Sequence, residues 1–109
     1  SGVDATLDLN AIPWLEGAVD CVGMGITSSL QPANVRLRRA IRNQQAVVDD
    51  PRYPLLFDPQ TAGGLLASVP EGAVEDCLRK LKAAGYHASA KVGAVLPQSD
   101  ELSPIVIEQ

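Results

Sequence analysis

The residues best suited to chemistry lie close together between positions 58 and 64. Asp58 supplies a carboxylate, Gln60 an amide and Thr61 a hydroxyl, while Gly63 and Gly64 leave backbone N–H groups open to close approach. Such a loop suits an anion or a metal-bound phosphate. The same residues also fit a structural role, in which the aspartate caps a turn and the glycines allow a sharp entry into a strand.

A second polar turn comes earlier in the chain. It runs from Gly23 to Ser29, contains Thr27 and Ser28, and leads to Asn34. A turn of glycine and hydroxyl residues before a helix can bind an anion through unpaired N–H groups and the helix dipole. The Gly-Lys-Ser/Thr ending of a P-loop is missing. Ordinary capping of the helix by one of the two serines is the alternative.

The overall composition describes a small acidic domain with an aliphatic core. The 109 residues carry a net charge of −4 and are 46% hydrophobic but only 4% aromatic. This charge gives no reason to expect a nucleic-acid partner, and the length suits one core. The sequence shows no leader, lipidation motif or long apolar run, so we expect a cytoplasmic protein with no membrane partner.

The cysteines and arginines show no arrangement that defines a site. Cys21 and Cys77 are far apart and form no C-x-x-C pair, which predicts buried free thiols, with a disulfide between them as the alternative. Four arginines gather between positions 36 and 42; a solvated helix face is their usual meaning, and a phosphate contact by one of them is the alternative. The sequence predicts no metal-ligand cluster and no nucleophile–base pair.

The periodicity of apolar residues predicts the elements that must position these groups. Period-2 alternation and apolar runs predict strands at 3–9, 55–57, 65–69, 88–94 and 105–107. Helical spacing predicts helices at 13–22, 32–47 and 71–84. The resulting order of β, α, α, β, β, α, β, β indicates an α+β fold in which helices cover a mixed β-sheet.

The central loop resembles a family signature. The string from Asp58 to Leu66 is similar to the Asp-Pro-Gln-Thr-Ser-Gly-Gly-Leu-Leu motif of selenophosphate synthetase, also called selenide, water dikinase, with Ala62 in place of serine. Leu7-Asp8-Leu9 and Ala84-Gly85-Tyr86 also resemble the C-terminal domain of that family. The resemblance implies that residues 1–109 form one such C-terminal domain, with a fold like that of aminoimidazole ribonucleotide synthetase-related enzymes.

The resemblance implies an enzyme of which this chain is one part. Complete family members use ATP and Mg²⁺ to make selenophosphate from selenide and water, with release of AMP and phosphate. The family's N-terminal ATP-binding domain carries the catalytic groups and is absent here, so we expect an inactive domain with no catalytic residue, no metal ligand and no tightly bound cofactor. The implied partners are that N-terminal domain and, for the full-length protein, a second copy in a homodimer.

The resemblance also implies roles for the two polar regions. Asp58, Gln60 and Thr61 would orient phosphate, metal-bound water or selenide, and Gly63 and Gly64 would allow close backbone approach. The loop would line the cleft that faces the ATP-binding domain. Thr27, Ser28 and Asn34 form a second candidate region. The rival hypothesis is a non-catalytic packing or oligomerisation domain of a larger polypeptide, including one fused behind a flavoprotein domain.

Overall fold

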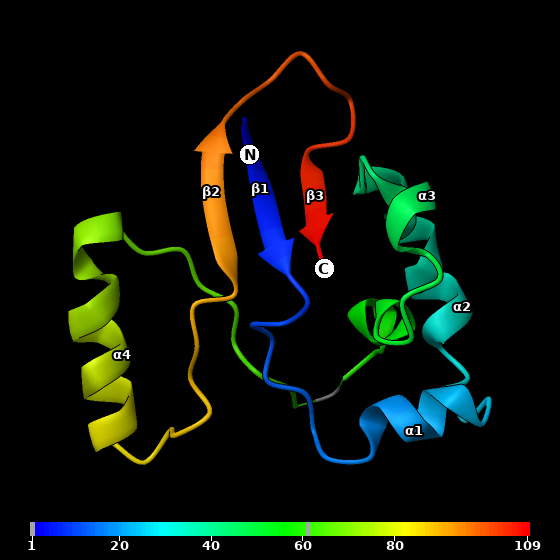
Figure 1. The fold of residues 1–109 in the computed structure, drawn as a ribbon, viewed down its shortest axis with the longest axis horizontal. Coiled ribbons are helices and arrows are strands. Elements are labelled where there is room, and N and C mark those ends of the chain that lie inside the picture. Colours follow the sequence, from blue (N-terminus) through cyan, green and yellow to red (C-terminus); the bar gives the residue numbers. More distant parts are fainter. Residues whose placement is uncertain (1, 61) are drawn as a thin grey trace.

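The first strand is the centre of a three-stranded sheet, because both of its edges are paired. In a computed structural model that describes residues 2–60 and 62–109, β1 (Val3–Asp8) pairs antiparallel with β2 (Gly93–Pro97) and parallel with β3 (Ile105–Glu108). The strand order is β2-β1-β3, so the sheet is mixed (Figure 1). In this register Leu7 lies opposite Gly93 on one side and opposite Ile107 on the other.

Helical segments follow one another between β1 and β2. In Figure 1, α1, α2 and α3 lie on the β3 side of the sheet, and α4 lies beside β2. The predicted α+β fold with a mixed sheet is confirmed. In the described residues the helical segments are α1 (Ala18–Gly23), α2 (Gln31–Asn34), a 3-10 helix (Val35–Ala40), α3 (Gln44–Val47), two further 3-10 helices (Tyr53–Phe57 and Glu71–Ala73), and α4 (Val74–Ala83).

The two strands predicted on either side of the Asp58 loop are wrong. Residues 55–57 belong to the 3-10 helix Tyr53–Phe57, where Pro54 occupies the first turn and suits helical φ. Residues 65–69 have no regular structure, and Leu65 is 95% exposed. A short apolar run fits a strand or a buried helical turn equally well, so periodicity could not separate the two.

The helix predicted at 32–47 is interrupted at Ile41. This residue has extended backbone angles (φ −94°, ψ 117°) and forms a bridge with Ile105 of β3. The Arg42 N–H then donates to the Ile105 carbonyl at 2.7 Å. Pairing with β3 therefore overrides the local preference for helix.

The remaining predicted elements are right in type and differ in extent. The helix predicted at 13–22 begins only at Ala18, because Gly17 adopts the left-handed region (φ 79°) just before it. The strand predicted at 88–94 lies at 93–97 instead. The helix predicted at 71–84 is confirmed as a 3-10 turn followed by α4, and Gly85 with φ 100° ends it.

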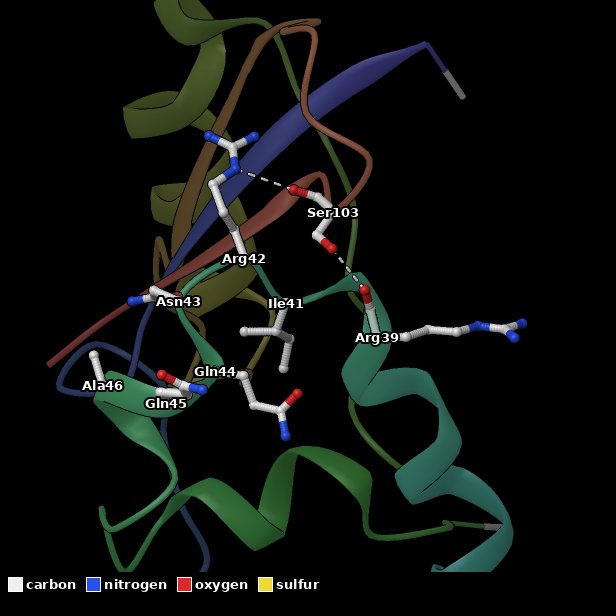
Figure 2. Close-up of a pocket in the computed structure, with 8 residues that line it drawn as sticks. All are labelled: Arg39, Ile41, Arg42, Asn43, Gln44, Gln45, Ala46 and Ser103. Atoms are coloured by element: carbon white, nitrogen blue, oxygen red, sulfur yellow. Dashed lines mark hydrogen bonds between the residues drawn. The ribbon is translucent and has the colours of Figure 1, made fainter.

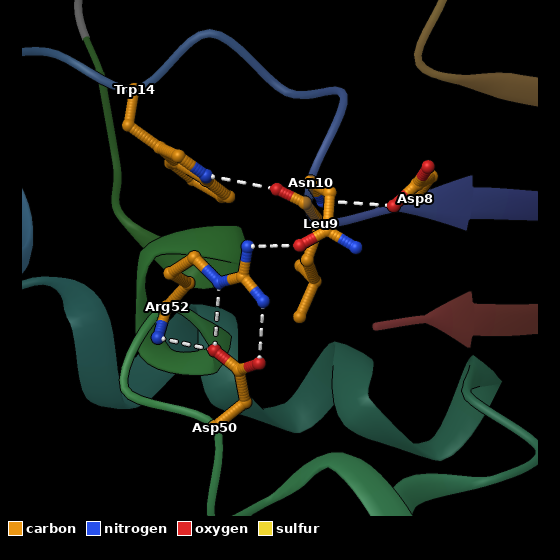
Figure 3. Close-up of polar contacts among 6 residues, drawn as sticks. All are labelled: Asp8, Leu9, Asn10, Trp14, Asp50 and Arg52. Atoms are coloured by element: carbon orange, nitrogen blue, oxygen red, sulfur yellow. Dashed lines mark hydrogen bonds and ion pairs between the residues drawn. The ribbon is translucent and has the colours of Figure 1, made fainter.

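The core lies between the β1–β3 side of the sheet and the helices around α3. Two of its members are aromatic: Tyr53 and Phe57 make an edge-to-face contact with ring centroids 5.2 Å apart. Trp14 packs against this core and donates its indole N–H to the Leu9 carbonyl at 3.1 Å (Figure 3). The buried apolar residues are Leu9, Ile41, Val47, Tyr53, Phe57 and Ile107.

A network of polar contacts ties the end of β1 to the segment that leads to Asp58. The Arg52 guanidinium pairs with the Asp50 carboxylate at 2.8 Å and donates to the Asn10 side-chain oxygen at 2.8 Å (Figure 3). The hydrogen bonds from Arg52 lower the pKa of the Asp50 carboxyl, and the same pair raises the pKa of Arg52. The first turn of the 3-10 helix Tyr53–Phe57 is therefore anchored to the loop after β1.

Arg42 fastens β1 to the connection between β2 and β3. Its guanidinium pairs with the Asp4 carboxylate at 2.6 Å and donates to the Ser99 hydroxyl at 2.9 Å. The Ser99 hydroxyl also donates to Asp4, which is only 5% exposed. Hydrogen bonds from Ser99 and then Arg42 lower the pKa of the Asp4 carboxyl, so this buried group is held ionised.

A side chain completes the outer edge of β3. The Asn43 Nδ2 donates to the Ile107 carbonyl at 2.7 Å, and the Asn43 Oδ1 accepts from the Ile107 N–H at 3.0 Å. Together with the bridge between Ile41 and Ile105, these bonds let residues 41–43 pair with the edge of β3 that faces away from β1. In the described residues, β2 forms the other edge of the sheet and pairs only with β1.

Candidate functional site

Asp58 and the polar turn at residues 27 and 28 line the same hollow. Its volume is about 340 Å³, near the lower end of the range for small-molecule pockets. Aliphatic side chains from α1, from Ile26 and from Leu55 form part of its wall. Its polar lining residues are Cys21, Thr27, Ser28, Gln31 and Asp58. The structure thus brings Ser28 and Asp58, which are 30 residues apart in the sequence, to the same hollow.

Two side chains of α2 position the 3-10 helix that ends at Asp58. The Gln31 Nε2 donates to the Pro54 carbonyl at 2.9 Å, and the Asn34 Nδ2 donates to the Phe57 carbonyl at 3.1 Å. Asp58 then leaves the helix with extended angles (φ −66°, ψ 120°), as expected for the residue before a proline. Asn34 does not line the hollow; its amide holds the backbone that presents Asp58.

The hollow has acidic character. Asp58 is half-buried, and no lysine, arginine or histidine is among the described residues that line the hollow. A free anion would therefore meet a carboxylate without a compensating positive charge. A cation, or an anion that arrives bound to a metal, suits this lining better.

Gln31 was not found by sequence reasoning, although it is the most deeply buried residue of the hollow. It is 7% exposed, and its Oε1 has no hydrogen-bond partner among the described residues. Only the Nε2 of the amide can donate to the Pro54 carbonyl, so this contact fixes the orientation of the amide and leaves the Oε1 without a donor. No local pattern distinguishes Gln31 from an exposed residue at the start of a helix.

The other candidate residues of the Asp58 loop that the structure describes lie outside the hollow. Gln60, Gly63 and Gly64 are exposed and do not line it, and Thr61 lies outside the described residues. Neither Gly63 nor Gly64 has a positive φ, so the loop does not use their left-handed freedom. A Cβ on Gly63 would come within 1.9 Å of the Gln60 Oε1, so this glycine leaves room for the amide.

A second hollow, of about 480 Å³, lies beside residues 39–46 (Figure 2). Its Arg42 guanidinium is already engaged by Asp4, Ser99 and the Ser103 carbonyl. Figure 2 shows the Arg39 side chain extending away from the other lining residues. The remaining arginines of the cluster, Arg36 and Arg38, are exposed, as a solvated face requires.

Neither cysteine is buried. Cys21 is exposed and Cys77 is half-buried, and both thiols are free, so the predicted burial is wrong. Within residues 2–60 and 62–109, no group of three or more His, Cys, Asp or Glu side chains could hold a metal ion. No helix in this part of the chain is both long enough and apolar enough to cross a membrane.

Comparison with known proteins identifies relatives along nearly the whole chain, although no protein-family model matches it. The chain is 30% identical to the selenide, water dikinase of Clostridioides difficile, over 93% of its own length and 29% of the relative's. It is 36% identical to the selenide, water dikinase of Trichlorobacter lovleyi, over 98% of its own length and 30% of the relative's. It is 32% identical to that of Pelobacter propionicus, over 99% of its own length and 30% of the relative's. The chain spans less than a third of the length of these curated relatives. It is therefore a relative of the selenide, water dikinases, the selenophosphate synthetase family that its central loop resembles.

Proposed function

We propose that residues 1–109 form the C-terminal domain of a selenide, water dikinase. The complete protein makes selenophosphate from ATP, selenide and water in the presence of Mg²⁺, releases AMP and phosphate, and works as a homodimer. The chain's relatives, which carry this name and match nearly all of it, support the proposal. The structural observation that carries it is the hollow in which Asp58 meets Thr27 and Ser28.

Asp58 acts in this proposal through a metal-bound water. Because no positively charged residue is among the described lining, direct contact between its carboxylate and a phosphate is unfavourable. Mg²⁺ usually keeps several of its waters, and these waters are good donors to a carboxylate. Gln60 and Thr61 orient the phosphate or the selenide, and Gly63 and Gly64 let it approach the backbone.

The chain alone is inactive in this proposal. Phosphoryl transfer depends on groups that clamp the phosphates and the metal. The described residues hold no group of three or more side chains able to bind a metal, and the ATP-binding domain supplies the clamps. The active cleft therefore forms only when the two domains face each other.

A second function, a packing or oligomerisation domain, is favoured by the exposed surface of the chain. Its accessible surface is 8038 Å², whereas a monomer of this mass is expected to expose about 5,800 Å². Leu65 and Leu102 are 95% and 100% exposed. In this alternative, apolar surface packs against a neighbour and Asp58 only shapes a turn.

Substitution of Asp58 in the complete polypeptide separates the two functions. We expect Asp58→Asn to lower the kcat/KM of selenide-dependent AMP formation about 10- to 100-fold, as for residues that orient metal-bound groups, with an unchanged melting temperature. Asp49→Asn is the matched control, because Asp49 is exposed and lies outside the hollow. If Asp58→Asn and Thr61→Ala both leave the turnover unchanged, the loop is structural and the packing function stands.

A further inference from the structure

We infer that the hollow at Asp58 binds an alkylammonium group, that is, a protonated primary amine on a short carbon chain. This inference goes beyond the dikinase reaction and does not depend on it. Three properties of the lining carry it: a carboxylate with no counter-ion among the described residues, a buried amide oxygen with no donor among them, and several aliphatic side chains.

Asp58 differs from the other shielded carboxylates of the described residues. Asp4 and Asp50 each pair with an arginine, and Asp8 accepts a hydrogen bond from the Asn10 N–H. Asp58 is half-buried too, yet no described residue forms an ion pair or a hydrogen bond with its carboxylate. Partial removal of a carboxylate from water is unfavourable unless a positive charge compensates it. A bound cation would supply that charge.

The acceptors around Asp58 match the donors of an ammonium group. The Gln31 Oε1 lacks a donor among the described residues, and its amide orientation is fixed by the Pro54 carbonyl. Thr27 and Ser28 line the same hollow, and a hydroxyl can accept two hydrogen bonds; the Ser28 Oγ already accepts one from the Leu30 N–H at 3.3 Å. An ammonium group has three N–H donors and no acceptor, so its hydrogen-bonding capacity matches a lining that offers acceptors.

The apolar part of the lining distinguishes an organic cation from a metal ion. Ala18, Val22, Ile26 and Leu55, which have aliphatic side chains, also line the hollow. A carbon chain gains by covering this surface, whereas a Mg²⁺ or Ca²⁺ ion bound directly by the lining would need oxygen ligands in its place. An anion is disfavoured because no lysine, arginine or histidine is among the described residues of the lining.

Titration of the 109-residue chain with n-butylammonium, followed by ¹H–¹⁵N NMR, tests the inference. We expect shifts of the Gln31 side-chain amide and of the backbone amides of Ser28 and Asp58, with a Kd on the order of millimolar for so small a ligand. Butyrate, which has a similar carbon chain and the opposite charge, should cause none of these shifts. Binding should weaken as the salt concentration rises.

Two variants locate the site. Asp58→Asn should weaken n-butylammonium binding by about tenfold or more, while Asp49→Asn, which removes the same charge from an exposed position outside the hollow, should leave it unchanged. Gln31→Met keeps the length of the side chain and should also weaken binding. The NMR spectrum without ligand reports whether each variant is folded.

A further titration distinguishes the two sources of an alkylammonium group. Nα-acetyl-lysine amide represents a lysine side chain of a protein segment, and n-butylammonium represents a free amine. The compound with the lower Kd identifies the source of the alkylammonium group. The inference is overturned if neither compound shifts these resonances at up to about 50 mM, well above the expected Kd. It is also overturned if butyrate or Mg²⁺ alone reproduces the shifts, or if folded Asp58→Asn binds as tightly as the parent chain.

Discussion

Replacement of Gly93 with alanine tests how closely β2 packs on β1. Gly93 lies opposite Leu7 in the antiparallel pair. A Cβ at this position would lie 1.8 Å from the Thr6 carbonyl oxygen and 2.8 Å from its carbonyl carbon. Both atoms belong to the backbone of the central strand, so they cannot rotate away as the end of a side chain would.

The size of this overlap sets the expected loss of stability. The Cβ would fall short of ordinary van der Waals separation by roughly 1.5 Å. To make room, β2 must move away from β1, which weakens bonds such as that from the Asp8 N–H to the Val92 carbonyl (2.8 Å). Overpacking of this kind destabilises by about 1–3 kcal/mol, and we expect the upper end because backbone meets backbone. The melting temperature should fall by about 10 °C or more.

Thermal and urea unfolding, followed by circular dichroism, measure the effect. Gly64→Ala is the matched control, because its φ is not positive and no atom lies within 4 Å of the added Cβ. The control should change the free energy of unfolding by less than about 0.5 kcal/mol. A Gly93→Ala chain that unfolds at the same urea concentration as the parent would refute the close approach of the two strands.

Two further predictions concern charge and exposed surface. Because Ser99 and Arg42 lower the pKa of Asp4, its contribution to stability is present above the unfolded-state pKa of about 3.9 and is lost as the pH falls through the lower folded-state pKa. As the pH is lowered from neutral to about 2, the urea concentration at the unfolding midpoint should therefore fall more for the parent chain than for Asp4→Asn. An equal fall in the two chains would contradict this assignment. Leu65→Ser combined with Leu66→Ser should leave the melting temperature nearly unchanged, because these side chains are 95% and 71% exposed, and should reduce self-association in sedimentation. A parent chain that sediments as a monomer at every concentration would argue against an apolar interface.

The elements that the sequence predicted well are those whose pattern is local. α4 has an apolar stripe, an acidic first turn, a basic last turn and Gly85 after it, and all of these signals act within the helix. Alternation also located β1, yet the one buried residue of this strand is Asp4, which pairs with Arg42 of a distant segment. No alternation rule can anticipate a buried carboxylate that depends on a residue 38 positions away.

The site shows the same division between local and long-range information. Residue types alone singled out Asp58, Thr27 and Ser28, because carboxylates and hydroxyls carry their chemistry wherever they lie. Their meeting in one hollow depends on contacts from α2 to the Pro54 and Phe57 carbonyls, each across 23 residues. The strand predicted at 55–57 is wrong because Leu56 and Phe57 pack in or against a core from a helical turn, which sequence periodicity does not reveal. The strand predicted at 65–69 is wrong because its apolar residues are exposed, with Leu65 at 95% and Leu66 at 71%.

The closure of the β3 edge by residues 41–43 limits how the sheet can grow. Asn43 uses both the donor and the acceptor of its amide on Ile107, so a foreign strand finds these backbone groups already taken. The opposite edge, β2, has no charged residue from Gly93 to Pro97 and no strand beyond it in the described residues. Two copies that joined through β2 would each use their one open edge and be related by a twofold axis. Strand addition would then end with a closed pair and could not continue into a filament.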